Sequence, residues 1–280
     1  MSGTGTGLEL QVGGAIAHLR LRRAHAANSF DASFWQQLPL CLAQIAGDPS
    51  VRVVIMSGEG KHFSAGMDLA YFASAQRRAD WEEGRYREWL RRLILSLQRP
   101  ITQLEELGVP VVAAVQGACL GAGLDLACAC DLRYATADAF FAVQETAIGM
   151  TADLGVLQRL PRIVGAQAAR EMAYTGAKIS AAEAHAIGLI GAPLSNVDEL
   201  MSKVEGVAQQ IAGRSPLAMT GTKAAFTAQA REALAQELAH IASWNAAMWV
   251  SEDLAIGIEA QRARTDPVYR DLLGPAPLKE

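Results

Sequence analysis

Two strongly apolar segments, each followed at once by glycines, constrain the fold of this chain more than any other feature of its sequence. They are VRVVIMSG at residues 51–58, which continues into EGKHFSAGMD, and VPVVAAVQG at 109–117, which continues into ACLGAGLDL. Short β-branched runs bounded by glycines are typical of buried strands. The segment 109–130 is about long enough to span a membrane, but its glycines, Gln116 and Asp125 favour a strand, a turn and the start of a helix.

Helical patterns alternate with these strands, which predicts an α/β fold whose last third is mainly helical. We expect a core domain over residues 1–200 and a C-terminal helical region over 201–280. The other expected elements are two short strands around Gly13-Gly14, a helix over 31–47 that begins at Asp31, mostly helical structure over 69–106, a strand, loop and strand over 132–143, helices from 154, a short strand at 189–194, and two or three long helices up to about residue 262.

The composition narrows the possible partners. The net charge is −4 and the isoelectric point is near 5.8, which argues against a nucleic-acid partner. The four cysteines have apolar neighbours and no zinc-ligand spacing, so we expect buried thiols and no metal site. The first residues show no signal-peptide pattern and the last, PLKE, are not a peroxisomal address, so we expect a cytoplasmic protein with no membrane partner.

Both glycine-rich loops fail as phosphate-binding loops. The first has His62 where a phosphate loop needs serine or threonine, and the second has Leu126 where a dinucleotide-binding fold needs its third glycine. Each loop does offer backbone N–H groups near the start of a helix, and two converging N–H groups form an oxyanion hole. The alternative is that the glycines only permit tight turns between strand and helix.

Taken together, the two loops resemble the crotonase (enoyl-CoA hydratase/isomerase) superfamily. The resemblance rests on HFSAGMDL at 62–69, VQGACLGAGLDLACACDLRYA at 115–135 and AQAAREMAYTGAKISAAEAHAIGLI at 166–190, and it extends from about residue 8 to 265. It implies a crotonase (ClpP-like) spiral of ββα units, with C-terminal helices that support trimers, often paired into hexamers. It also implies an acyl-CoA thioester as substrate and no cofactor beyond the coenzyme A of that substrate. One minor departure is Ala24, where the family often has proline.

The resemblance also assigns roles to backbone groups of the two loops. By position, the two oxyanion N–H donors of the family correspond to Met67 and Ala122, although the family usually has glycine at the second position. Lys61 corresponds loosely to a contact with the coenzyme A phosphates, and the alternative for it is a solvated surface lysine. The remaining residues expected to bind the substrate are Ala65, Gly66 and Gly121.

Three acids in apolar surroundings suggest the reaction. The two glutamates of the family's hydratases correspond to Asp125 and Glu145, and Asp153 replaces a glycine that hydratases usually have. This trio is more similar to the dienoyl-CoA isomerases, which convert 3,5-dienoyl-CoA to 2,4-dienoyl-CoA, than to the hydratases. A proton shift from C2 to C6 exceeds the reach of one carboxyl, about 3 Å per contact, so two are expected. We expect Glu145 as the base at C2 and Asp153 as the acid at C6, with Asp125 tuning the pair or joining a proton relay.

Each acid also has a structural interpretation. Asp125 falls in the first turn of a helix and would favour its N-terminus, and Asp153 would cap the helix that follows it. We interpret Asp131 and Asp68 as structural. Two alternatives to the isomerase remain at this point: an enoyl-CoA hydratase that adds water to a 2-trans-enoyl-CoA, and a non-catalytic acyl-CoA-binding homologue.

Overall fold

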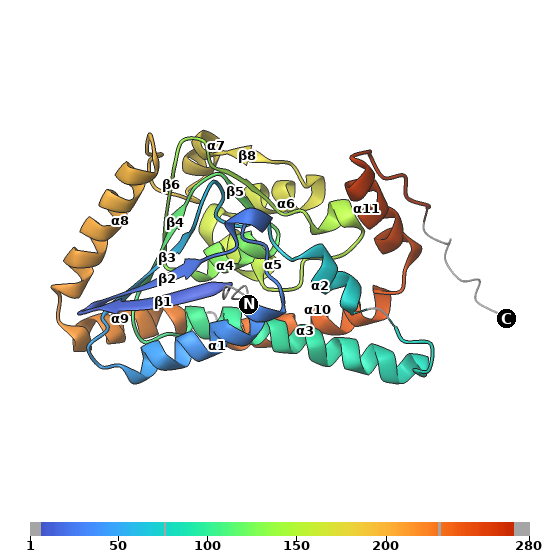
Figure 1. Cartoon of the computed structure of the whole chain (residues 1–280), viewed down its shortest axis with the longest axis horizontal. Helices are drawn as coiled ribbons and strands as arrows, with labels where there is room; N and C mark the ends of the chain where they lie inside the picture. Colours follow the sequence, from blue (N-terminus) through green and yellow to red (C-terminus); the bar gives the residue numbers. More distant parts are fainter. Residues whose placement is uncertain (1–6, 76, 229–230, 272–280) are drawn as a thin grey trace, which may run out of the picture.

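The main sheet of the protein holds the two apolar segments as neighbouring central strands. The computed structural model describes residues 7–75, 77–228 and 231–271. The five strands lie in the order β1-β2-β3-β4-β6, antiparallel between β1 and β2 and parallel from there on (Figure 1). They are β1 (Leu8–Gly13), β2 (Ile16–Leu21), β3 (Val53–Gly58), β4 (Val111–Val115) and β6 (Leu132–Ala135). A small second sheet contains β5 (Ala118–Leu120), β7 (Phe140–Ala142) and β8 (Ile179–Ser180), in that order.

Helices cover both faces of the main sheet, which explains why its central strands are apolar at every position. On β3, Val53 and Ile55 pack against helix α8 (Val197–Ala212) on one side. Val54 and Met56 face the larger core on the other side, to which helices α1 (Ala32–Gly47) and α3 (Glu83–Glu105) contribute. Side chains alternate between the two faces of a strand, so a strand covered on both sides is apolar throughout.

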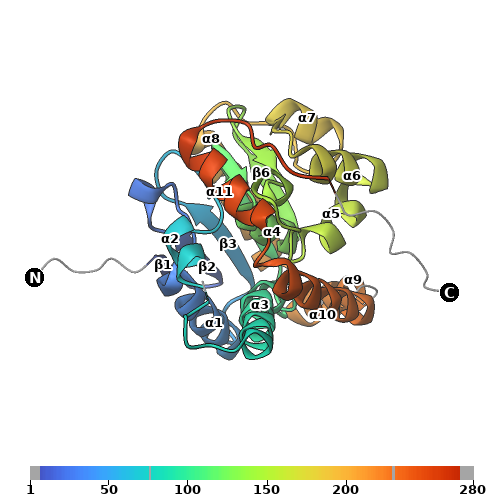
Figure 2. The same ribbon diagram turned by 90° about the vertical axis from the view of Figure 1, so that its right-hand side faces the viewer.

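The remaining helices arrange the glycine-rich loops and the C-terminal region. They are α2 (Leu69–Ser74), α4 (Ala122–Ala129), α5 (Val156–Val164), α6 (Ala166–Thr175), α7 (Ala181–Ala186), α9 (Pro216–Ala228), α10 (Arg231–Met248) and α11 (Glu252–Ala263), with 3₁₀ turns η1 (Ala24–Ala26) and η2 (Glu145–Ile148). Helix α10 packs along α3 (Figure 2), and α11 lies at the opposite end of the molecule from α8 (Figure 1). A Cβ added to Gly257 of α11 would come within 2.4 Å of the Ile148 carbonyl carbon, so α11 contacts η2 closely.

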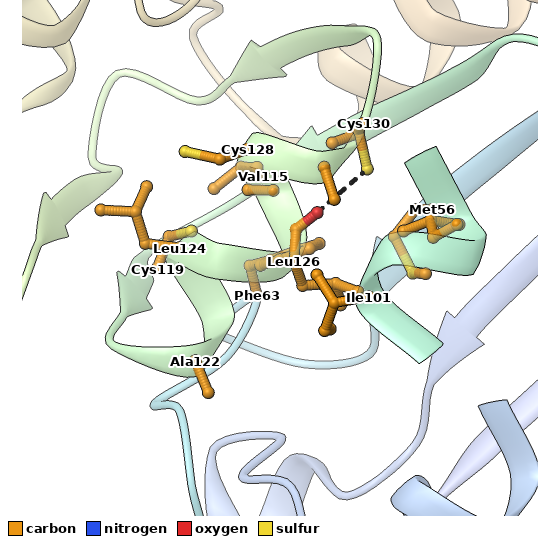
Figure 3. Close-up of a cluster of buried hydrophobic side chains, with 14 of the residues drawn as sticks. Met56, Phe63, Ile101, Val115, Cys119, Ala122, Leu124, Leu126, Cys128 and Cys130 are labelled. Atoms are coloured by element: carbon orange, nitrogen blue, oxygen red, sulfur yellow. Dashed lines mark hydrogen bonds between the residues drawn. The ribbon is translucent and has the colours of Figure 1, made fainter. Parts of the chain in front are cut away.

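Helix α4 is buried along its whole length, although it carries Asp125. All eight of its residues are buried, and Figure 3 shows Leu126 beside Ile101 and Met56. Three of the four cysteines are free and buried, as predicted: Cys119, Cys128 and Cys130. The prediction is wrong for Cys41 of α1, which is free but only half-buried. Among the described residues, no helix is both long and apolar enough to cross a membrane.

Most of the expected elements are confirmed, and the errors concern very short strands and the number of C-terminal helices. Asp31 caps α1 by accepting the N–H of Phe34. The predicted strand at 189–194 is wrong, because only an isolated bridge joins Leu194 to Thr136 there. Strands β5 and β8 were not expected, and within the described residues four helices rather than two or three follow residue 196. The expected division between residues 200 and 201 stays a prediction, and that boundary falls inside α8.

Candidate active site

The two glycine-rich loops lie against each other. The N–H of Ser64 donates to the Ala118 carbonyl at 3.0 Å, and the N–H of Leu120 donates to the Ser64 carbonyl at 3.0 Å. A Cβ added to Gly123 would lie only 2.8 Å from the Ser64 Cβ. Contact this close explains why both loops are built from small residues.

Gly66 is required at the point where the loops come closest. Its φ of +90° is one that side chains rarely adopt, and a Cβ there would lie 2.7 Å from the Leu120 carbonyl oxygen. The same Cβ would lie 3.3 Å from the backbone nitrogen of Ala122. The absence of a side chain at Gly66 therefore brings the N–H groups of the following residue, Met67, and of Ala122 to the same pocket.

The two N–H groups are available to a ligand. Among the described residues, neither the Met67 nor the Ala122 backbone N–H donates to a protein acceptor. Ala122 is the first residue of α4, where an N–H has no partner within the helix. Two unpaired donors that line one pocket form a site for a developing oxyanion.

The pocket is narrow and mostly apolar. Its cavity volume is about 90 Å³. Five of the residues expected at the oxyanion site line it: Ala65, Gly66, Met67, Gly121 and Ala122. Lys61 is exposed and lies outside the pocket lining, so its contact with coenzyme A stays a prediction. The apolar wall consists mainly of Leu69, Phe72, Leu93, Ile94, Leu97, Ile148, Met150, Leu154 and Trp249.

Glu145 enters this pocket from the first position of η2. Glu145 is 9% exposed, and its Oε2 has no hydrogen-bond partner among the described residues. A Cβ on Gly121 would lie 3.3 Å from Glu145 Oε1, so the glycine leaves room for the carboxyl. Burial raises the pKa of Glu145 to about 7, and the nearby charge of Asp153 acts in the same direction.

Asp153 lines the same pocket and is held by two buried amides. Asn245 of α10 donates to Asp153 Oδ2 at 2.8 Å, and Gln98 of α3 donates to the Asp153 carbonyl at 2.7 Å. Burial raises the pKa of Asp153 to about 6, opposed by the hydrogen bond from Asn245. The capping interpretation of Asp153 is wrong, because the N-cap of α5 is Gly155 and no side chain caps it.

Asp125 lies outside the pocket lining and has no exposed surface. Its Oδ1 accepts the N–H of Val156, the first residue of α5, so it supports the start of that helix rather than of its own. Its Oδ2 has no partner among the described residues. Burial raises the pKa of Asp125 well above its ordinary value, and the charge of Glu145 adds to this rise. Asp125 is therefore coupled to the site electrostatically, without facing the pocket.

The other two acids are structural, as predicted. Asp131 accepts the N–H of Val111 at 2.7 Å and the ammonium group of Lys223 at 2.9 Å. Asp68 caps α2 and pairs with Arg23 at 3.0 Å.

Asn245 and Gln98 were not found from the sequence. Both are polar residues in otherwise apolar stretches, and that signal is too common to single them out. Within SWNAAMWV, Trp244 and Met248 are about half exposed, while Trp249 stacks on Phe72 in the pocket wall.

Comparisons with known proteins agree with this geometry. Residues 11–271 match the family model described as enoyl-CoA hydratase/isomerase. The chain belongs to the enoyl-CoA hydratase/isomerase family. It is 40% identical to the peroxisomal delta(3,5)-delta(2,4)-dienoyl-CoA isomerase of Arabidopsis thaliana over 260 residues, which are 92% of this chain and 94% of that one. It is 36% identical to the human mitochondrial protein of the same name over 248 residues, 88% of this chain and 75% of that one.

The crystal structure of an enoyl-CoA hydratase from Mycobacterium avium subsp. paratuberculosis superimposes with a TM-score of 0.82. The two chains are 27% identical, and the match covers 95% of this chain and 99% of the other. The predicted family and the crotonase fold are thus confirmed, and this member of the enoyl-CoA hydratase/isomerase family is an enzyme.

Proposed function

We propose that this enzyme is a dienoyl-CoA isomerase that converts 3,5-dienoyl-CoA to 2,4-dienoyl-CoA in the β-oxidation of unsaturated fatty acids. The observation that carries the proposal is Asp153, a second carboxyl in the same apolar pocket as Glu145. The names of the Arabidopsis and human relatives point to the same reaction. A hydratase or a non-catalytic acyl-CoA-binding protein would have no use for a buried acid at this position.

The oxyanion hole stabilises the charge that forms on the thioester. The carbonyl oxygen accepts hydrogen bonds from the N–H groups of Met67 and Ala122. These bonds stabilise negative charge on the oxygen and thereby make the C2 protons more acidic. Removal of a C2 proton by Glu145 gives a dienolate whose charge extends to C6. Asp153 then delivers a proton to C6, and both double bonds end in conjugation with the carbonyl. The proton gained by one carboxyl equals the proton lost by the other, so the two must exchange before the next turnover.

The pKa values of the two carboxyls suit this exchange. Glu145 lies at about 7 and Asp153 at about 6. Between about pH 6 and pH 7 the pair therefore holds about one proton, which either carboxyl can carry. Moving it to Asp153, where the forward reaction needs it, costs little free energy, because the pKa values of the two carboxyls lie close together. This cost is small against a catalytic barrier, so both directions of the shift stay accessible.

We further propose a homo-oligomer, a trimer or a dimer of trimers, with an acyl-CoA as the only small-molecule partner. The half-exposed Trp244 and Met248 on α10 support a surface that another subunit covers. Coenzyme A enters as part of the substrate, and the reaction needs no further cofactor because no electrons are transferred. The location in the cytoplasm stays a prediction, and the relatives named above carry peroxisomal and mitochondrial names.

The test is to give the purified enzyme a 3,5-dienoyl-CoA and a 2-trans-enoyl-CoA separately. We expect the long-wavelength absorbance of a conjugated dienoyl thioester from the first and little addition of water to the second. Fast hydration without isomerisation would establish the hydratase instead. Binding of both thioesters with no change in either would establish the non-catalytic homologue.

A further inference from the structure

Asn245 reaches the pocket from a part of the chain about 90 residues beyond the acids. It lies on α10, is only 2% exposed, and uses both N–H bonds of its amide. One donates to the Thr151 carbonyl at 2.6 Å and the other to Asp153 Oδ2 at 2.8 Å. A buried amide with both donors satisfied is fixed in one orientation.

The Thr151 carbonyl decides which atom of the amide faces Asp153. A carbonyl can only accept a hydrogen bond, so the nitrogen of Asn245, not its oxygen, must point to Thr151. The same nitrogen then presents its second N–H to Asp153 Oδ2. A proton on Oδ2 would meet that N–H head-on, so Oδ2 stays unprotonated whenever this hydrogen bond is present.

The other carboxyl oxygen is left for chemistry. Within the described part of the chain, no other residue donates a hydrogen bond to Asp153 Oδ1, and Asp153 lines the reaction pocket. The backbone of Asp153 is held as well, because Gln98 bridges its carbonyl and the Leu238 carbonyl of α10. With the backbone and Oδ2 both fixed, the carboxyl cannot rotate to exchange its two oxygens.

We propose that Asn245 is a positioning residue that assigns the two oxygens of Asp153 different tasks: Oδ2 is held by the amide, and Oδ1 carries the proton and passes it to the substrate. This rests on the proposed isomerase function for the identity of the reaction. The placement of the proton rests only on the contacts described above. The C-terminal helical region thereby takes part in the reaction through α10.

The decisive variant is Asn245→Leu, tested in the full-length protein. Leucine matches asparagine roughly in size and has no donor. It is preferable to alanine because Asn245 also borders a neighbouring cavity of about 370 Å³, from which water would replace the lost donor. Loss of the donor removes a bond that favours the ionised carboxylate, so the pKa of Asp153 rises by about one unit or more.

Two measurements follow this change. The first is an NMR titration of protein labelled with ¹³C at the aspartate carboxyls, in which the Asp153 signal is identified by its absence in Asp153→Asn. The second is the pH profile of kcat/KM with a 3,5-dienoyl-CoA. We expect the Asp153 titration, and the limb of the pH profile that reports it, to move to higher pH in Asn245→Leu. The maximal kcat should fall about tenfold, because the carboxyl that delivers the proton is no longer held in place, and KM should change little.

Gln98→Leu is the matched control. It removes the same kind of buried amide from the same aspartate, but the lost bond is to the backbone carbonyl and not to the carboxyl. We expect it to lower the melting temperature as Asn245→Leu does, and to leave the Asp153 titration where it is in the wild type. Asn245→Ser keeps one donor and leaves room for a bridging water, so its titration should lie between those of the wild type and Asn245→Leu.

The outcomes separate this inference from the proposed function. If Asn245→Leu is less stable but its Asp153 titration matches that of the wild type, Asn245 is merely structural and the inference is overturned. If Asn245→Leu does not fold, an unshifted titration in Asn245→Ser overturns it equally. If the titration shifts but the wild type isomerises no dienoyl-CoA, the inference about Asp153 stands and the proposed function fails.

Discussion

The turn that carries Glu145 and the segment that carries Asp153 bury their carboxyl groups almost equally, with 9% and 8% of each residue exposed. Their surroundings differ in kind. Glu145 has an unpaired Oε2 and adds its charge to the shift at the buried acid Asp125, whereas Asp153 is held by amides from α3 and α10. Burial raises both pKa values, that of Glu145 from 4.5 to about 7 and that of Asp153 from 3.8 to about 6, and the hydrogen bond from Asn245 opposes the rise at Asp153.

This difference suggests a division of labour. The unpaired Oε2 of Glu145 is free to face a substrate atom, whereas the carboxyl of Asp153, which Asn245 holds through Oδ2, can serve only a substrate atom delivered to a fixed point. Asp153 therefore suits the distal end of the acyl chain, where no oxyanion hole anchors the substrate.

The largest effect is expected from removing each carboxyl in turn. Glu145→Gln should lower isomerisation by at least about 10³-fold and also stop exchange of the C2 proton with deuterated water. Asp153→Asn should lower isomerisation comparably but leave C2 exchange, because the dienolate still forms beside Glu145. Mass spectrometry of the recovered dienoyl-CoA measures the exchange. The reverse pattern, with exchange lost only in Asp153→Asn, would exchange the roles of the two acids.

Gly66→Ala should lower both activities together. The added Cβ would lie 2.7 Å from the Leu120 carbonyl oxygen, and it would push the Met67 and Ala122 N–H groups apart. Loss of oxyanion donors costs about 10²–10³-fold in kcat, and here the C2 exchange should fall by the same factor because the dienolate itself is destabilised. Gly14→Ala is the control, because it places an alanine at a φ of +62° in the turn between β1 and β2, where the added Cβ meets no atom within 4 Å. C2 exchange that survives intact in Gly66→Ala would show that the two carboxyls work without this hole.

The sequence predicts the strands and glycine-rich loops that form this site, but not the two amides, of Asn245 and Gln98, that hold Asp153. The central strands, α1 and the glycine-rich loops each leave a local pattern, because burial on two faces and tight turns restrict residue type over several consecutive positions. Strands β5 and β8, of three and two residues, are too short to leave one. The acids were identified because their positions resemble a known family. Asn245 and Gln98 act through the packing of α10 on α3, a contact between distant segments that no local pattern encodes.

Ionisation of the two buried carboxyls should also lower the free energy of unfolding, and the decrease should be larger for Glu145 than for Asp153. The folded-state pKa of Glu145 is raised from 4.5 to about 7, so its ionisation opposes folding. That penalty is absent below about pH 4.5, grows as the pH rises to 7, and is complete above it. Glu145→Gln should therefore raise the free energy of unfolding by about 3 kcal/mol at pH 8 and change it little at pH 4.5. Denaturant melts at the two pH values measure this.

Asp153→Asn should also raise the free energy of unfolding above pH 6, but by less than Glu145→Gln does. Its pKa is raised from 3.8 to about 6, so the penalty grows between these pH values. The carboxylate also accepts a hydrogen bond from Asn245 that a neutral amide accepts less strongly. If Asp153→Asn raises the free energy of unfolding more than Glu145→Gln does, the hydrogen bond from Asn245 does not offset the cost of burying the Asp153 carboxylate.

The smallest effect is expected from Asp125→Asn. Burial raises the pKa of Asp125 well above its ordinary value, which favours the neutral carboxyl, and a neutral amide is its nearest replacement. The amide oxygen can still accept the N–H of Val156. We expect kcat/KM within about threefold of the wild type and an unmoved pH profile, since no catalytic charge changes.

Asp125→Ala should instead lower the free energy of unfolding by about 1–3 kcal/mol, because the Val156 N–H loses its acceptor. A pH profile displaced downward in Asp125→Asn would mean that Asp125 is ionised and raises the pKa of Glu145 by its charge.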